Sequence, residues 1–278
     1  MCATCGCSSG GTIRLLGPEN GHEHGSGHEH GPGHEHGPGR HDAHQHPPAD
    51  LQTLAASDGP RTVELQQKVL AKNDQIAQRN RAWLEDRGIL AVNLMSSPGS
   101  GKTTLLEATM RGLAGKVTIS VVEGDQETAL DATRILAAGS SVVQINTGAG
   151  CHLDAEMLAR ALRCLDPQSG SIVMIENVGN LVCPALFDLG ERARVVLASV
   201  TEGADKPLKY PHMFRQADLV LLNKIDLLPY VDFDVREYAS GLRKVTPDAL
   251  LLQVSATTGD GMDTWYDWLR RRTPVPSE

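Results

Sequence analysis

The stretch with the clearest chemistry runs from Ser96 to Thr104 and reads SSPGSGKTT. It follows an apolar run, Ile89–Met95, that is typical of a buried strand, and it precedes a segment with helical periodicity. Small residues in such a loop let backbone N–H groups point at phosphate oxygens, while Lys102 can reach the terminal phosphates and the Thr103 hydroxyl can ligate Mg²⁺. Ser96 stands where the general pattern G-x-x-x-x-G-K-[ST] has glycine. The spacing predicts a phosphate-binding loop with the contacting residues Gly99, Ser100, Gly101, Lys102, Thr103 and Thr104.

A second motif, Asn223-Lys224-Ile225-Asp226, directly follows the apolar run Leu219–Leu222. The Asp226 carboxylate can accept hydrogen bonds from N1 and N2 of guanine, whereas adenine lacks these donors. N-K-x-D alone is often a surface loop, but here it follows a phosphate loop and precedes a strand that ends in Val254-Ser255-Ala256. The predicted ligand is therefore GTP or GDP, with the base held by Asn223, Lys224, Asp226, Ser255 and Ala256.

Two acidic residues follow other apolar runs of the chain. Asp125 ends the stretch VVEGD, and Glu176 lies in VMIENVG. Because Mg²⁺ prefers carboxylate oxygens together with phosphates, both residues are candidate metal or water-positioning groups beside Lys102. The N–H of Gly179 could approach the third phosphate, so we expect residues 176–179 to act as a phosphate sensor. No glutamine follows Gly179 to orient an attacking water, which predicts slow hydrolysis.

A third group of residues carries thiol and imidazole side chains. Cys151-His152 follows the strand candidate Val142–Ile145, and Cys183 lies seven positions beyond Glu176. Two thiolates and one imidazole per chain leave a tetrahedral Zn²⁺ or square-planar Ni²⁺ one ligand short, which favours a dimer that shares ligands. Because Cys183 continues the expected phosphate sensor, nucleotide state and metal affinity should be coupled. Cys164, by contrast, is expected to be a small buried residue on an Ala/Leu-rich helix.

The amino-terminal segment offers further metal ligands. Cys2, Cys5 and Cys7 form C-x-x-C-x-C, whose soft thiolates suit Ni, Cu(I), Zn or an iron–sulfur cluster; a redox pair is a weaker alternative. Nine of the eleven histidines lie between residues 22 and 46, where Gly-His-Glu-His occurs three times. This tract is expected to buffer metal, or else to be a solvated linker, and its repeats contribute His22, His24, His28, His30, His34 and His36.

The elements that must position these residues follow from composition and periodicity. Residues 1–60 hold twelve of the 28 glycines and few apolar residues, so we expect a disordered metal-binding segment. Residues 61–88 have the three-to-four spacing of an amphipathic helix. Residues 89–278 alternate apolar strands with helices, which predicts an α/β domain with a mostly parallel sheet flanked by helices. The expected strands are 89–95, 117–122, 142–145, 171–176, 194–200, 219–222 and 250–254, and the expected helices are 103–113, 129–138, 154–164, 210–216, 235–244 and 261–271.

Charge and hydropathy exclude several classes of protein. The net charge of −8 argues against a general nucleic-acid binder, which would carry a basic surface. No apolar run approaches the ~18 residues that a membrane span needs, so no membrane insertion is expected. The amino terminus lacks the basic and apolar regions of a secretory signal, which favours a cytoplasmic protein.

Taken together, these motifs closely resemble the HypB family of GTPases, which serve nickel insertion into [NiFe]-hydrogenase. The resemblance covers MCATCGC and nearly all of residues 83–271, and its specific phrases include SSPGSGKTTLL, NTGAGCHLDA, IENVGNLVCPALFDLGE and LLNKIDLLPY. That family shares the serine at position 96. The resemblance implies a P-loop GTPase of the SIMIBI class, which dimerises with nucleotide. It also implies a tight nickel site at Cys2, Cys5 and Cys7 and an interfacial zinc or nickel site at Cys151, His152 and Cys183.

The resemblance further implies partners and leaves two alternatives. The expected partners are a HypA-type metallochaperone and the maturation complex of the hydrogenase large subunit. One alternative is a related GTPase that serves urease or a cobalamin enzyme, although the Cys-Pro-His arrangement of the urease GTPases is absent here. The other alternative is chiefly a nickel-storage protein, against which the complete set of nucleotide motifs argues.

Overall fold

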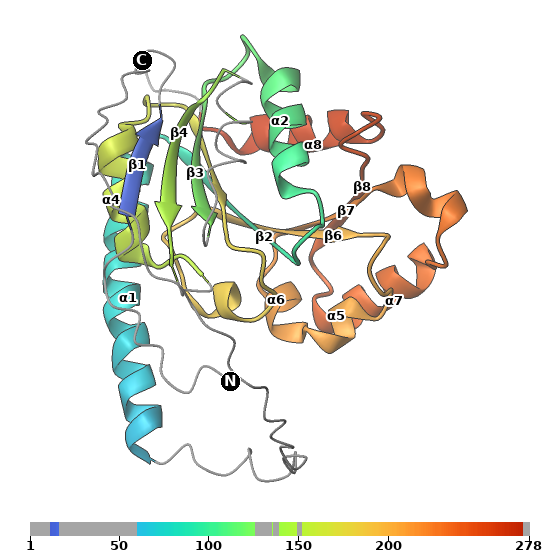
Figure 1. Ribbon diagram of the computed structural model, residues 1–278, viewed down its shortest axis with the longest axis horizontal. Helices are drawn as coiled ribbons and strands as arrows, with labels where there is room; N and C mark the ends of the chain where they lie inside the picture. The colour runs from blue at the N-terminus through green and yellow to red at the C-terminus, as the bar shows by residue number, and fades with distance from the viewer. Residues whose placement is uncertain (1–11, 17–59, 126–134, 136–138, 149–151, 275–278) are drawn as a thin grey trace, which may run out of the picture.

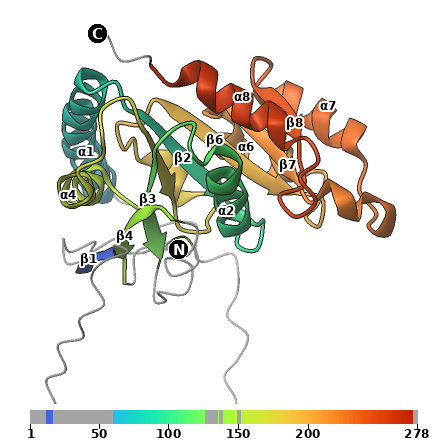
Figure 2. The same cartoon turned by 90° about the horizontal axis from the view of Figure 1, so that it is seen from above.

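The computed structural model describes residues 12–16, 60–125, 135, 139–148 and 152–274, and eight strands in these ranges form one sheet. The strands are β1 (Thr12–Leu16), β2 (Leu90–Ser96), β3 (Ile119–Asp125), β4 (Ser141–Asn146), β5 (Ile172–Glu176), β6 (Ala193–Ser199), β7 (Leu219–Asn223) and β8 (Leu250–Gln253). Their order across the sheet is β1-β4-β3-β5-β2-β6-β7-β8. All neighbouring pairs are parallel except β1 and β4, which are antiparallel. Figure 2 shows β1 at one end of the sheet and β8 towards the other.

Helices lie in several of the long connections that parallel strands need. They are α1 (Pro60–Asp86), α2 (Lys102–Leu113), α4 (Ala155–Leu165), α5 (Lys206–Lys209), α6 (Pro211–Arg215), α7 (Val235–Val245) and α8 (Met262–Arg272). Two 3₁₀ helices, η2 (Cys183–Leu186) and η3 (Ile225–Tyr230), interrupt the loops after β5 and β7. In Figure 1, α1 and α4 lie beside the β1–β4 end of the sheet, and α5 and α7 lie towards the β7–β8 end.

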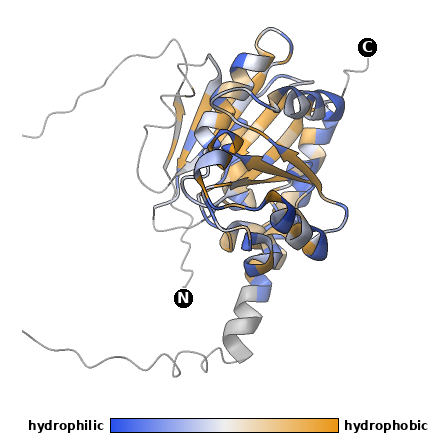
Figure 3. Ribbon diagram, turned by 90° about the vertical axis from the view of Figure 1, so that its right-hand side faces the viewer, coloured by the Kyte–Doolittle hydropathy of each residue, from blue (hydrophilic) through white to orange (hydrophobic). Residues whose placement is uncertain are grey.

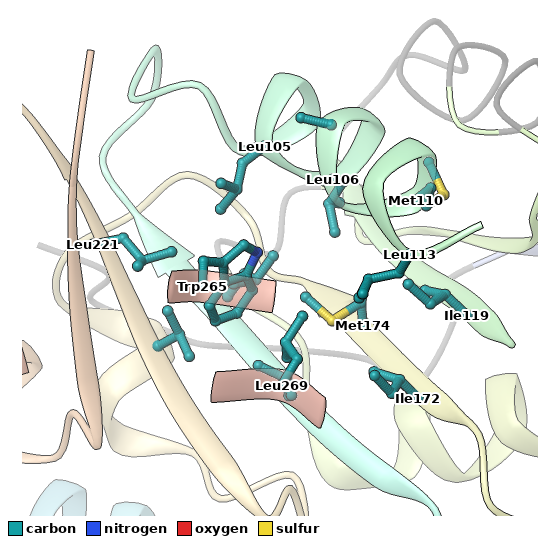
Figure 4. Close-up of a cluster of buried hydrophobic side chains, with 14 of the residues drawn as sticks. Leu105, Leu106, Met110, Leu113, Ile119, Ile172, Met174, Leu221, Trp265 and Leu269 are labelled. Carbon is teal, nitrogen blue, oxygen red and sulfur yellow. The ribbon is translucent and has the colours of Figure 1, made fainter. Parts of the chain in front are cut away.

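Both faces of the sheet are buried. Successive residues of β6 point to opposite faces, so that Val195 packs with α2 and α8 while Val196 packs with α6 and α7. Figure 4 shows the first of these cores, in which Trp265 and Leu269 of α8 gather with Leu106 and Leu113 of α2 and with strand residues such as Met174 and Ile172. A further core joins α1 and α4 to the other face at β3, β4 and β5. The apolar strands and the polar outer surfaces of the helices are visible in Figure 3.

The predicted α/β architecture is confirmed, with one correction in the amino-terminal segment. Residues 12–16, which lie within the segment 1–60 expected to be disordered, form β1 and pair with β4. Ile13 packs against the core that α1 and α4 cover, which gives this strand a buried partner. The expected helix 129–138 lies almost wholly outside the described residues. Helix α1, expected over residues 61–88, begins at Pro60 and ends at Asp86.

The carboxyl ends of the parallel strands place the predicted motifs along one edge of the sheet. β2 runs into the phosphate loop, β5 ends at Glu176, and β7 ends at Asn223. Glu123 of β3 pairs directly with Glu176 of β5 in the strand register. Ligands of such sheets bind at this edge. Among the described residues, no helix is long and apolar enough to cross a membrane.

Candidate nucleotide and metal site

A cavity of about 520 Å³ opens at the carboxyl edge of the sheet, between the phosphate loop and the segment after β5. Most of its walls come from residues that the motifs predict. The lining comprises Pro98, Gly99, Gly101, Lys102, Thr103, Thr104, Glu123, Gly124, Glu176, Asn177, Val178, Gly179 and Lys224. Of the proposed phosphate-contacting residues, Ser100 does not line the cavity, and its hydroxyl is buried without a hydrogen-bond partner.

The backbone of the phosphate loop has the shape that phosphate binding needs. Gly99 and Gly101 have φ angles of +75° and +98°, a region that side chains rarely adopt. A Cβ on Gly101 would lie 2.7 Å from Nδ2 of Asn223, and a Cβ on Gly179 would lie 3.1 Å from the Cα of Pro98. Glycine therefore allows both neighbours to approach the loop, and the residues present fit a nucleotide phosphate chain.

The hydrogen bonds of Ser96 account for a serine where the general pattern has glycine. Its hydroxyl donates to the carbonyl of Ser97 at 2.6 Å and accepts from Nζ of Lys102 at 2.8 Å. The hydroxyl of Thr103 donates to Oε1 of Glu176 at 3.1 Å. Lys102, Thr103 and Glu176 are therefore held together at the end of the cavity that the phosphate loop forms.

The predicted base-binding residues form a connected set. Asn223 donates to the carbonyl of Ser100 at 3.0 Å and accepts from the N–H of Ala256 at 3.1 Å. Lys224, at a φ of +63°, donates to the carbonyl of Gly99 at 2.8 Å. These bonds tie the base-binding loops to the phosphate loop.

Asp226 is held by a separate contact. The Ser255 hydroxyl donates to Oδ1 of Asp226 at 2.6 Å. The second carboxylate oxygen takes no part in this bond, and a guanine edge needs an acceptor of this kind.

Glu123 and Asn177 are polar cavity residues that the sequence did not single out, whereas the predicted Asp125 is described only in its backbone. Asp125 ends β3, and its side chain lies outside what the structure describes. Glu123, two positions earlier and thus on the same face of the strand, lines the cavity and is 2% exposed. That same-face spacing could have indicated it. Asn177 also lines the cavity, and its only signal was its position beside Glu176.

Of the predicted imidazole and thiol ligands, His152 and Cys183 are described. His152 is buried, and its ring stacks on Phe187 with the ring centroids 4.0 Å apart. Cys183 begins η2 and lies four residues before Phe187 on a partly exposed stretch. The structure therefore brings the His152 loop against the segment that carries Cys183.

The electrostatics of His152 suit a metal ligand. Burial lowers its pKa, and the nearby charge of Asp154 opposes this only in part. The neutral imidazole is the form that binds metal. Within the described ranges, no three His, Cys, Asp or Glu residues gather as a metal site, but Cys151 lies outside those ranges.

The remaining ligand predictions have different outcomes. Cys164 is exposed, so the expectation that it is buried was wrong: it sits on the outer side of α4. The amino-terminal candidates Cys2, Cys5 and Cys7 and the histidines of the repeats, from His22 to His36, lie outside the described residues.

Comparisons with known proteins agree with this geometry. The family described as "CobW/HypB/UreG, nucleotide-binding domain" matches residues 90–253. The hydrogenase maturation factor HypB of Azotobacter vinelandii is 50% identical and is matched over 98% of this chain and 92% of its own. HypB of Escherichia coli (strain K12) is 55% identical over 75% of this chain and 72% of its own.

A solved structure shares the fold. HypB from Helicobacter pylori, described in complex with nickel, is 37% identical with a TM-score of 0.69, covering 74% of this chain and 99% of that one. Because the family model matches residues 90–253 and these relatives are 50% to 55% identical over 75% to 98% of the chain, the protein belongs to the HypB family of hydrogenase maturation factors, GTPases of the CobW/HypB/UreG group.

Proposed function

We propose that this protein is a slow GTPase that stores nickel and delivers it during [NiFe]-hydrogenase maturation. One observation carries the proposal: the chain from Glu176, beside the phosphate loop, runs directly to Cys183 and then to Phe187, which stacks on His152. A change at the third phosphate therefore acts on the same segment that would hold the metal. The nickel complex of the relative from Helicobacter pylori supports nickel as the cargo.

The nucleotide chemistry is assigned to residues at the sheet edge. Lys102, already beside Ser96, would hold the terminal phosphates, and Thr103, Asp125 and Glu176 would hold Mg²⁺ directly or through water. When bound, Mg²⁺ neutralises charge on the phosphate oxygens. Asp226, oriented by Ser255, would select guanine. Asn180 follows Gly179, where a glutamine could have oriented an attacking water, and this supports slow turnover.

The metal chemistry is assigned to two regions. His152 and Cys183, with Cys151, would bind nickel or zinc, and a second copy of the chain would complete the ligand set in a dimer. Cys2, Cys5 and Cys7 would form a further nickel site, and the histidine repeats would buffer metal. A HypA-type metallochaperone and the maturation complex of the hydrogenase large subunit are the proposed partners.

Turnover of GTP by the full chain tests the enzymatic half of the proposal. Lys102→Ala should abolish GTP turnover. Among the described contacts, no other cationic side chain is hydrogen-bonded to Ser96 at this position. Lys116→Ala, which removes an exposed lysine at the end of α2, is the matched control and should leave turnover unchanged. Turnover that survives Lys102→Ala would contradict the assignment.

Metal titration tests the other half. Nickel and zinc affinities are measured with GDP and with a non-hydrolysable GTP analogue, and they should differ between the two nucleotide states. Repeating the titration without residues 1–60 separates the amino-terminal ligands from the site at Cys183. Equal affinities in both states would contradict the coupling.

A further inference from the structure

Asn177 links the nucleotide cavity to the His152 loop by direct hydrogen bonds. The residue follows Glu176, lines the cavity, and is 1% exposed. Its side-chain oxygen accepts from the N–H of Leu153 at 3.2 Å and from the N–H of Val178 at 3.0 Å. Leu153 is the residue next to His152. One buried amide therefore bonds to the phosphate-sensor segment and to the backbone of the candidate metal loop.

The side chain of Leu153 also touches the wall of the cavity. A Cβ placed on Gly124, which lines the cavity at the end of β3, would lie between 2.7 and 2.9 Å from three Leu153 atoms. Leu153 itself is fully buried. Both its backbone and its side chain are thus in contact with groups that face the nucleotide.

A second route runs from Asn177 to the segment after Cys183. Its Nδ2 donates to Oδ1 of Asn93 at 3.3 Å, and Nδ2 of Asn93 donates to Oε1 of Glu191 at 3.2 Å. The other Glu191 oxygen accepts from the N–H of Leu189 at 2.8 Å, two residues beyond Phe187. All members of this chain of contacts are buried.

We infer that Asn177 is the positioning residue that couples nucleotide state to metal affinity, an inference that rests on the proposed function. Leaving a buried N–H without an acceptor has a large cost in free energy. When the sensor segment moves towards or away from a third phosphate, the Leu153 N–H must follow Asn177, and the neighbouring His152 moves with it. The Asn93–Glu191 route transmits the same displacement to the Phe187 side, so both halves of the candidate metal site respond together.

Helix α1 supplies a matched control. Nδ2 of Asn80 donates to the carbonyls of Ala155 and Leu189 at 2.8 and 2.9 Å. Asn80 is 5% exposed, and its two acceptors lie shortly after His152 and shortly after Phe187 in the sequence. Asn80 does not line the nucleotide cavity. Asn80→Ala therefore removes a comparable number of buried hydrogen bonds without interrupting the route through Asn177.

The test compares nickel dissociation constants of the full chain in its GDP and GTP-analogue states. Coupled sites typically differ by about 5- to 150-fold. Asn177→Ala should reduce the wild-type ratio towards one, the value for uncoupled sites. Asn80→Ala should lower the melting temperature similarly and retain the ratio. Asn177→Ser, whose shorter hydroxyl would not span the distance to Leu153, is used if the alanine variant does not fold.

A second readout needs no metal. Hydrogen exchange at the Leu153 amide is measured in the metal-free protein with GDP and with the GTP analogue. The exchange rate should respond to the nucleotide in the wild type and in Asn80→Ala, but not in Asn177→Ala.

Three outcomes overturn parts of this account, and they are distinguishable. A wild-type nickel ratio near one contradicts the proposed function, and the coupling assigned to Asn177 with it. A ratio that persists in both Asn177 variants, or is lost equally in Asn80→Ala, contradicts the assignment to Asn177 alone. A Leu153 amide that still responds to nucleotide in Asn177→Ala contradicts it as well.

Discussion

At the scale of single residues, the conformation of the phosphate loop depends on the glycines that lack a Cβ as much as on the side chains that are present. Gly99 and Gly101 both have positive φ angles, but a Cβ added to Gly101 would lie only 2.7 Å from the side chain of Asn223. Apart from its two chain neighbours, no described residue has an atom within 4 Å of the corresponding position on Gly99. The two glycines therefore share a backbone requirement and differ in a steric one.

Replacing each glycine by alanine separates these requirements. Both variants introduce backbone strain of about 1 kcal/mol. Gly101→Ala must also displace Asn223, which bonds to the Ser100 carbonyl, so its loss of GTP affinity should exceed that of Gly99→Ala by roughly tenfold, about 1.4 kcal/mol. Calorimetric titration with a GTP analogue measures the difference. Equal losses would show that contact with Asn223 is unimportant.

The choice of base also rests on one carboxylate. Asp226→Asn should weaken GTP binding by about 1.5–3 kcal/mol, because guanine's N–H donors then meet an amide instead of a charged acceptor. The same variant should gain affinity for xanthine nucleotides, whose extra carbonyl can accept from that amide. Competition between GTP and XTP measures the change. Ser255→Ala, which removes the hydroxyl bonded to Asp226, should weaken GTP binding without increasing the affinity for XTP.

At the scale of elements, α1 does more than cover the sheet. Arg81 forms two hydrogen bonds of 2.8 Å with the two carboxylate oxygens of Asp188, and the Gly190 N–H bonds to the same carboxylate. Asn73 donates to the Asp188 carbonyl at 2.7 Å. The helix is thus fastened to the turn that leads from η2 into β6, and this turn follows the segment that carries Cys183.

The Arg81–Asp188 contact makes this fastening sensitive to pH. Burial alone would raise the pKa of Asp188, but the bonds from Arg81 and Gly190 outweigh it and hold the pKa below its usual value. The carboxylate therefore stabilises the fold above the unfolded pKa of about 4, and this contribution is lost as pH falls through the lower native pKa. Asp188→Asn should reduce the free energy of unfolding at pH 7 by about 1–3 kcal/mol.

Urea unfolding at pH 7 and near pH 3 checks this prediction. The difference between wild type and Asp188→Asn should shrink at the lower pH. Asp205→Asn, which removes the partner of Lys209 in an ion pair whose side chains are 44% and 64% exposed, should change stability little at either pH. A difference that grows in acid would mean that the charge at position 188 destabilises the fold.

At the scale of the whole molecule, the nucleotide edge and the amino-terminal ligands are separate in sequence and in expected role. Removing residues 21–46, which contain the histidine repeats, should lower the number of nickel ions bound per chain. It should leave GTP turnover unchanged, because the described lining of the cavity comes from residues between Pro98 and Lys224. Equilibrium dialysis and a phosphate-release assay measure the two quantities. A marked fall in turnover would indicate that the tract acts on the nucleotide site.

Much of this molecule was predictable because its signals are local. Apolar runs such as 219–222 identified strands, and the spacing of Lys102 and Thr103 identified the phosphate loop. Glu123 and Asn177 were missed because their role comes from register and from contacts with segments far apart in the chain. Strand β1 was missed because five residues in a glycine-rich context carry little periodicity, and only pairing with β4 orders them.

The direction of β1 limits where the two amino-terminal ligand sets can reach. Thr12 pairs with Asn146, at the end of β4 that leads to His152, whereas Leu16 pairs with Val142 at the far end. Four residues lie between Cys7 and Thr12 in the sequence, and a fully extended chain spans at most about 18 Å over these five steps. The chain therefore enters β1 at the rim near His152 and leaves it at the opposite rim. This one short edge strand separates the proposed amino-terminal cysteine ligands, which precede it in the sequence, from the proposed histidine ligands, which follow it.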